Sequence, residues 1–115
     1  MNLKKVLEGL EGIKAKGEID REITTIEKDS RKVVEGSMFF AIKGFTTDGT
    51  QYISSAIEKG AKVVLVEEGT DIKAINIPED VTLLVVPDAR YAMAICSCNF
   101  YDNPSRKFKL IGVTG

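Results

Sequence analysis

The residues best suited to chemistry in this sequence lie between Asp29 and Gly49, in two polar turns that flank one short apolar run. The turns carry hydroxyls, glycine and charged groups: Ser30, Arg31 and Lys32 in the first, and Lys43, Gly44, Thr46, Thr47 and Asp48 in the second. Hydroxyls, backbone N–H groups beside glycine and fixed cations are the groups that hold a phosphorylated or sugar-bearing ligand. The pattern therefore indicates a binding stretch for such a ligand.

The sequence lacks the residues that several other kinds of chemistry require. The chain has no histidine, which removes the commonest general base and the commonest metal ligand. Its two cysteines, Cys96 and Cys98, are two positions apart in a predicted helix, so they point to nearly opposite faces and we expect no disulfide. We set aside a Cys-His nucleophile pair and a zinc site, and we interpret both thiols as packing groups.

Length and charge limit the class of protein. With 115 residues, 43% apolar and 29% charged, the chain has the size and composition of one soluble globular domain. The net charge of −1 gives no broad basic surface for nucleic acid. No apolar run is long enough to span a membrane, and no apolar segment of a signal peptide follows the first residues, so we expect a cytoplasmic protein without a membrane or nucleic-acid partner.

Strands and helices are predicted to alternate along the chain. We predict strands at 22–27, 37–42, 62–67, 81–86 and 108–113, and helices at 2–10, 51–59 and 88–101. We predict a loop between Gly12 and Gly17, and 71–78 stays ambiguous between a short helix and an irregular crossing. This alternation predicts an α/β fold, a single domain with a mixed, partly parallel sheet flanked by helices.

Smaller signals refine this prediction. Asn2 is placed as the N-cap of the first helix, Asp48 to Thr50 has the residues of another helix N-cap, and Gly60 stands where a helix ends. Phe39 and Phe40 are adjacent in a strand, so one ring is expected in the core and the other under a helix. At the end of the sequence, a predicted strand runs into Gly112-Val113-Thr114-Gly115, which is how a phosphate-binding loop begins, although the loop needs further residues.

Several spaced motifs resemble the opening domain of the Mur amide ligases. They are Asp29-Ser30-Arg31-Lys32-Val33, then Gly36-Ser37-Met38-Phe39-Phe40-Ala41-Ile42-Lys43-Gly44, then Asp48-Gly49 and Gly60-Ala61. Further on, Asp88-Ala89-Arg90, Phe100-Tyr101 before Pro104-Ser105, and Leu110 to Gly115 are similar to the run into the ATP site of the tripeptide-synthetase (MurE) type. The resemblance covers roughly 20–115, and the motifs occur in the family's order.

The resemblance implies a substrate-binding domain. The MurE type adds the third amino acid to UDP-N-acetylmuramoyl dipeptide: ATP phosphorylates a substrate carboxylate, and the incoming amine displaces phosphate. Residues 1–110 would be the domain that binds the UDP end, and 111–115 would begin a central domain that binds ATP and Mg²⁺. We expect neither cofactor to bind the chain itself, which contains no catalytic set and should be inactive without the central and C-terminal domains.

The resemblance also implies site residues. Ser30 matches the family serine that contacts the UDP end, and Lys28 stands beside that pocket. Phe45, Thr46 and Thr47 fall on the loop that touches uridine and diphosphate, although many relatives have His-Gln there and Phe45 donates no hydrogen bond. Gly115 matches the first glycine of the ATP loop.

Other interpretations remain open. Arg31 is interpreted as a structural residue, paired with Asp48 or Glu35, rather than as a phosphate clamp, and Asp48 as a helix cap. The chain could also be the first domain of the sibling that adds D-Ala-D-Ala (the MurF type), or a stand-alone nucleotide-sugar-binding module. The sequence does not say whether meso-diaminopimelate or L-lysine is added, nor what the oligomeric state is.

Overall fold

The computed structural model of the chain describes residues 1–42, 52–70 and 77–101. Within them, five strands form one sheet in the order β1-β5-β4-β3-β2. The strands are β1 (Lys14–Lys16), β2 (Ile26–Glu27), β3 (Met38–Phe40), β4 (Val63–Glu67) and β5 (Thr82–Val86). The pairs β2–β3, β3–β4 and β4–β5 are parallel, and only β1 runs antiparallel, against β5. The predicted mixed, partly parallel α/β sheet is confirmed.

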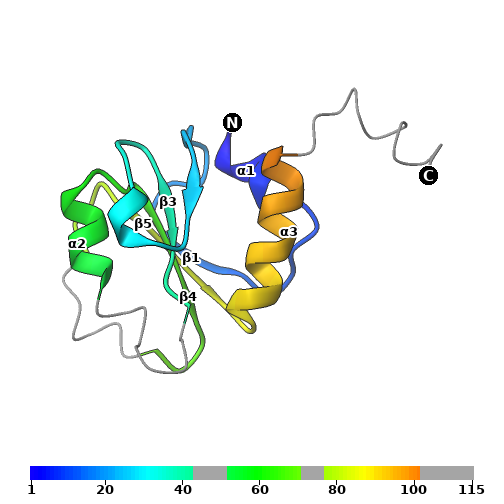
Figure 1. The fold of residues 1–115 in the computed structure, drawn as a ribbon. Coiled ribbons are helices and arrows are strands. Elements are labelled where there is room, and N and C mark those ends of the chain that lie inside the picture. The colour runs from blue at the N-terminus through cyan, green and yellow to red at the C-terminus, as the bar shows by residue number, and fades with distance from the viewer. Residues whose placement is uncertain (43–51, 71–76, 102–115) are drawn as a thin grey trace.

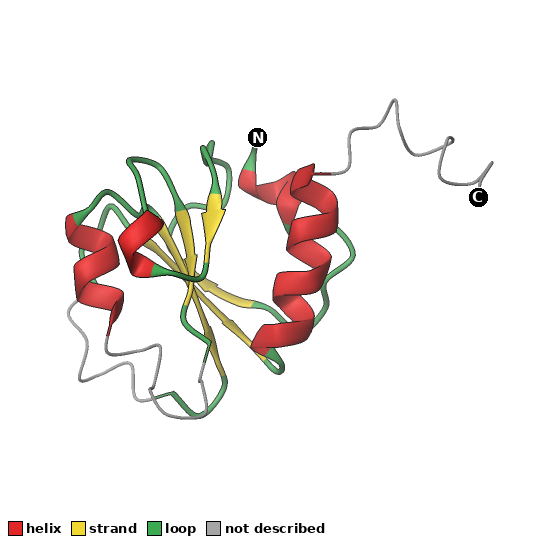
Figure 2. Ribbon diagram, viewed as in Figure 1, coloured by secondary structure: helices red, strands yellow, loops and turns green. Residues whose placement is uncertain are grey.

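Helices cover both faces of this sheet (Figures 1 and 2). Helices α1 (Leu3–Val6) and α3 (Ala89–Tyr101) lie on one face. Helix α2 (Ile53–Glu58) and the 3₁₀ turn η1 (Ser30–Lys32) lie on the other. None of the helices in the described part of the chain is long and apolar enough to cross a membrane.

The core consists of two apolar clusters, one on each face of the sheet. Because strand side chains alternate between faces, Phe40 joins the cluster under α1 and α3, while Phe39 joins the cluster under α2. Both rings are almost fully buried, as predicted. The continuous apolar runs of β4 and β5 supply residues to both clusters, which explains why those strands lack an apolar–polar alternation.

Two predicted helix ends are confirmed. The Oδ1 atom of Asn2 accepts a hydrogen bond from the Lys4 N–H at 2.9 Å and caps α1. Gly60 follows α2 with φ of +117°, a backbone conformation that favours glycine. The predicted helix N-cap at 48–50 lies outside the described residues, as do most of the ambiguous segment 71–78 and the last predicted strand at 108–113.

Three predictions near the N-terminus are wrong in part. The helix predicted at 2–10 is shorter, because α1 spans only Leu3–Val6 and Gly9 after it has a φ of +91°. The expected loop between Gly12 and Gly17 contains β1, whose three exposed residues carry no apolar alternation and form a strand only through pairing with β5. The predicted strand 22–27 is shorter, because its first half follows the N-terminus instead. There the Ile23 N–H donates to the Met1 carbonyl at 2.9 Å, and Glu22 forms an isolated antiparallel β-bridge with Asn2.

Candidate functional site

The candidate site lies at the edge of the sheet where the parallel strands end. Strands β2 to β5 run in one direction, so their carboxyl ends share this edge. In open α/β sheets, ligands bind outside the carboxyl ends of the strands. The two polar segments predicted to bind a ligand follow β2 and β3, which are hydrogen-bonded neighbours. Both segments therefore start at adjacent points of the same edge.

Ser30 is the best-placed predicted site residue. It opens η1 directly after the carboxyl end of β2 and is 8% exposed. Its carbonyl accepts a hydrogen bond from the Val33 N–H at 3.3 Å. Its hydroxyl has no hydrogen-bond partner among the described residues, and a buried hydroxyl without a partner is uncommon in folded proteins. The turn thus offers a hydroxyl that a ligand can use.

Asp29 and Arg31 fix the shape of this turn. The Asp29 Oδ1 atom accepts from the Arg31 N–H at 2.9 Å and from Arg31 Nε at 3.1 Å, while Oδ2 accepts from Nη2 at 2.9 Å. These hydrogen bonds from Arg31 lower the pKa of Asp29 to about 2. The structural interpretation of Arg31 agrees with this geometry, but the expected partner does not: Glu35 pairs with Lys62, and Asp48 lies outside the described residues.

The remaining predicted site residues are placed only in part. Lys28 is exposed at the carboxyl end of β2, two positions before Ser30. Phe45, Thr46, Thr47 and Gly115 lie outside the described residues, so their proximity to Ser30 stays a prediction.

The two cysteines differ in their burial. The Cys96 thiol is buried, and burial raises its pKa to about 12, while Cys98 is exposed; neither forms a disulfide. The interpretation as a packing group is confirmed for Cys96 and is wrong for the exposed Cys98.

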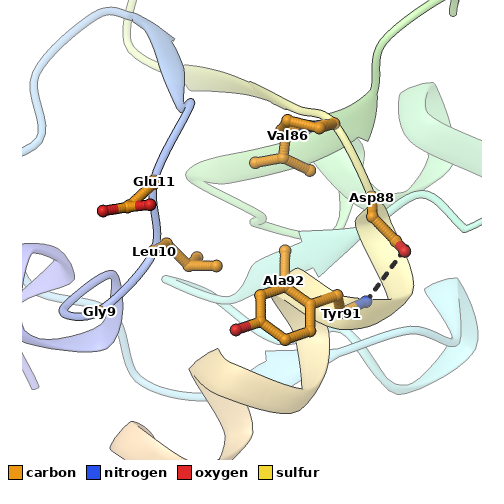
Figure 3. Close-up of a pocket in the computed structure, with 8 residues that line it drawn as sticks. Gly9, Leu10, Glu11, Val86, Asp88, Tyr91 and Ala92 are labelled. Carbon is orange, nitrogen blue, oxygen red and sulfur yellow. Dashed lines mark hydrogen bonds between the residues drawn. The ribbon is translucent and has the colours of Figure 1, made fainter.

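A pocket that the sequence did not reveal lies farther along the same edge. It has a volume of about 240 Å³ and is formed where the loop after α1 meets the start of α3. Figure 3 shows Leu10, Val86 and Ala92 pointing toward one another in its centre, with Tyr91 beside them. The loop reaches this position because β1, which follows it, pairs with β5. Without β1 in the prediction, no sequence signal joins these segments.

The start of α3 is not an open anion site. The Asp88 Oδ1 atom accepts from the N–H groups of Arg90 at 3.0 Å and Tyr91 at 3.1 Å, the latter drawn in Figure 3. The Glu67 Oε1 atom accepts from the Ala89 N–H at 2.9 Å. These donors at the helix start are already satisfied by carboxylates. The pocket therefore offers mainly an apolar surface.

No metal site is present in the part of the chain that the structure describes, where no three His, Cys, Asp or Glu side chains gather. The residue predicted to belong to the ATP phosphate loop, Gly115, lies outside the described residues.

Comparison with known proteins decides the family. The sequence profile described as "Mur ligase family, catalytic domain" matches residues 22–101. The chain belongs to the Mur ligase family. It is 46% identical over 115 residues to the UDP-N-acetylmuramoyl-L-alanyl-D-glutamate–2,6-diaminopimelate ligase of Clostridioides difficile (strain 630), and 42% identical to the ligase of the same name from Bacteroides fragilis. All of this Mur ligase chain aligns, but it spans only 22% and 23% of those relatives.

Solved Mur ligase structures share the fold. MurF from Acinetobacter baumannii matches 85% of the chain with a TM-score of 0.59 and 25% identity, and the match spans 20% of that protein. MurF from Thermotoga maritima, solved with ADP, matches 64% of the chain with a TM-score of 0.51 and 26% identity, over 16% of its length. The architecture predicted for a Mur ligase domain is therefore the one found.

Proposed function

We propose that this chain is the domain that binds the UDP end of the substrate in a MurE-type ligase, an enzyme that adds the third amino acid to UDP-N-acetylmuramoyl dipeptide. The relatives aligned over the whole chain, at 40 to 46% identity, carry the name of a diaminopimelate ligase. We extend that substrate, 2,6-diaminopimelate, to the longer protein of which this chain would be a part. The proposed location is the cytoplasm.

The observation that carries the proposal is the Ser30 hydroxyl. It is buried, without a partner among the described residues, and located where β2 ends beside β3. A nucleotide's ribose and phosphate groups supply the donors and acceptors that such a hydroxyl requires. Lys28 would add positive charge nearby, and Phe45, Thr46 and Thr47 would complete the pocket from the segment after β3.

The chemistry itself is assigned to other parts of the longer protein. Bound ATP and Mg²⁺ would supply the phosphoryl group and its charge neutralisation. In the proposal, residues 111–115 begin the central domain that holds them, and Gly115 is the first glycine of its phosphate loop. In this proposal, the chain binds the UDP end of the substrate and so positions the distant, reacting end in the central domain.

Steady-state kinetics of the full-length protein tests the proposal. Ser30→Ala should raise KM for UDP-N-acetylmuramoyl dipeptide roughly 3- to 10-fold, the equivalent of one lost hydrogen bond, with little change in kcat. Ser54→Ala, at an exposed position of α2, is the matched control and should leave both constants unchanged. A full-length protein without diaminopimelate-dependent ADP release, or an unchanged KM for Ser30→Ala, would contradict the proposal.

A second function has one observation in its favour. The solved structures compared above are MurF proteins, and a further one from Acinetobacter baumannii is named as a D-alanyl-D-alanyl ligase. Their identity to this chain is 25 to 26%, against 46% for a diaminopimelate ligase, so we favour the first function. The same assay separates the two: ADP release that requires D-Ala-D-Ala instead of diaminopimelate would favour the second.

A further inference from the structure

Helix α3 carries a row of apolar side chains on its outer face. Tyr91, Ala94 and Cys98 are exposed and Ile95 is half-buried, and they follow the i, i+3, i+4, i+7 spacing of one helix face. We call these four residues the outer stripe. Tyr91 alone leaves 59% of its surface exposed.

The opposite face of α3 packs against the core of the domain. Ala89, Ala92 and Cys96 are buried in the core cluster, with Met93 and Phe100 packed against it. Asn99 further ties the helix to the loop after α1, because its Nδ2 atom donates to the Val6 carbonyl at 2.8 Å and the Glu8 carbonyl at 2.7 Å. The helix is therefore fixed in rotation, and the outer stripe stays outside.

The outer face of α3 also lacks the charges that a solvated helix carries. Arg90 is the one charged residue within Ala89–Tyr101. A surface helix of a globular protein normally has charged and polar residues opposite its apolar face. Helix α2 follows that rule, with Ser54, Glu58 and the following Lys59 exposed. The two helices lie on opposite faces of the sheet (Figure 1). Of the two, α3 is the one whose exposed side chains are mainly apolar.

We propose that the outer stripe is a docking surface for the domain that follows this one in the same polypeptide. The proposal rests on the proposed function, in which the chain continues past Gly115. Helix α3 is the last described element, and the chain spans only 22 to 23% of its first relatives, so most of a protein of their length would follow α3. Tyr91 also lines the pocket, so the same partner can insert a side chain between Leu10 and Ala92.

The size of the stripe favours this occupant over a second copy of the chain. A helix of this length is about 20 Å long and about 10 Å wide, which gives roughly 200 Å². A stable complex between separate proteins needs about 800 Å² from each partner. Between two domains of one chain, a patch this small can form part of a larger contact, because the covalent connection keeps the partner at a high effective concentration.

Cys98 provides a direct probe, and Cys96 is its internal control. Cys98 is exposed on the stripe, whereas Cys96 is buried two residues away. We would follow maleimide labelling of both thiols by tandem mass spectrometry, in the 115-residue chain and in the full-length protein. Cys98 should react fast in the short chain and at least about tenfold more slowly in the full-length protein, as for a surface uncovered less than a tenth of the time. Cys96 should stay unlabelled in both.

A charged substitution supplies the second readout. Ala94→Glu should leave the thermal midpoint of the short chain unchanged, because Ala94 is exposed, but should restore fast labelling of Cys98 in the full-length protein. Ser54→Glu on α2 is the matched control and should leave the labelling of Cys98 in the full-length protein slow. Equal Cys98 labelling in both proteins would overturn the proposal. The proposal would also be overturned if Cys98 of the short chain reacted slowly, and more slowly still at higher protein concentration. That result would identify a second copy of the chain as the occupant.

These outcomes are separate from those for the proposed function. Substrate binding at Ser30 with no protection of Cys98 would reject the docking surface alone. Protection of Cys98 in a protein without ligase activity would support the docking surface and reject the proposed substrate.

Discussion

The two ends of the parallel strands differ in how their polar groups are used. At the amino ends, the groups bond to one another: the Gly36 N–H donates to the Gly60 carbonyl at 2.8 Å, and Lys62 Nζ lies 3.1 Å from an Asp80 oxygen and 3.6 Å from a Glu35 oxygen. At the carboxyl ends, Ser30 has a hydroxyl without a partner among the described residues, and a pocket opens beside α3.

This difference separates stability from binding within one small domain. The hydrogen bonds and ion pairs at the amino ends tie neighbouring strands to one another and help to hold them in register. The carboxyl ends keep polar groups and concave surface available, as functional edges of α/β sheets do. Substitutions at the amino ends should therefore change the free energy of unfolding, and substitutions at the carboxyl ends should change binding.

The largest effect is expected at Gly60. A Cβ atom there would lie 2.6 Å from the Glu35 Cα atom, and the residue has φ of +117°. Gly60→Ala should lower the free energy of unfolding by about 2–4 kcal/mol, because backbone must move and the conformation is strained. Urea unfolding measures this. Gly69→Ala is the matched control, with φ of +92° but no atom within 4 Å, and should cost only about 1 kcal/mol.

A smaller effect is expected at Thr82, which is 1% exposed. Its hydroxyl donates to the Glu18 carbonyl at 2.5 Å and accepts from Arg21 Nη1 at 3.2 Å. Thr82→Val should cost about 1–2 kcal/mol in urea unfolding, since these groups lose a partner away from water. Thr24→Val also removes a hydroxyl bond, at 2.7 Å to the Glu35 carbonyl, but Thr24 is exposed, so it should cost less. Equal costs at both sites would argue against a buried network.

The smallest effect is expected at Asp29, on the carboxyl side. Arg31 lowers the pKa of this carboxyl from 3.8 to about 2, so its contribution to stability is present above pH 4 and is lost as pH falls to 2. In acid unfolding followed by circular dichroism, the free energy of unfolding of the Asp29→Asn variant should therefore fall less between pH 4 and pH 2 than that of the unsubstituted chain. Glu79→Gln, at an exposed position, is the control and should follow the unsubstituted curve.

The parts predicted from sequence are those whose pattern is local. The apolar runs of β4 and β5, the turn glycine at position 60 and the capped start of α1 each carry their own signal. Strand β1 does not, because Lys14, Ala15 and Lys16 are all exposed and become a strand only through β5. The pocket depends on that pairing and was missed for the same reason. The polar turn that contains Ser30 was visible in the sequence, but Ser30 was singled out within it only through the family resemblance, since a turn serine is by itself more often a turn cap.

Binding of UDP to the 115-residue chain tests the central claim most directly. In an ¹⁵N-¹H NMR titration, UDP at up to about 5 mM should shift the amide signals of Ser30, its neighbours in η1 and the 45–47 segment in a saturable manner, with weak affinity. The signals of Gly60, Lys62 and Thr82 at the opposite end should stay in place, and Ser30→Ala should weaken the response. Absence of saturable shifts near Ser30, or shifts confined to the amino ends of the strands, would contradict the account.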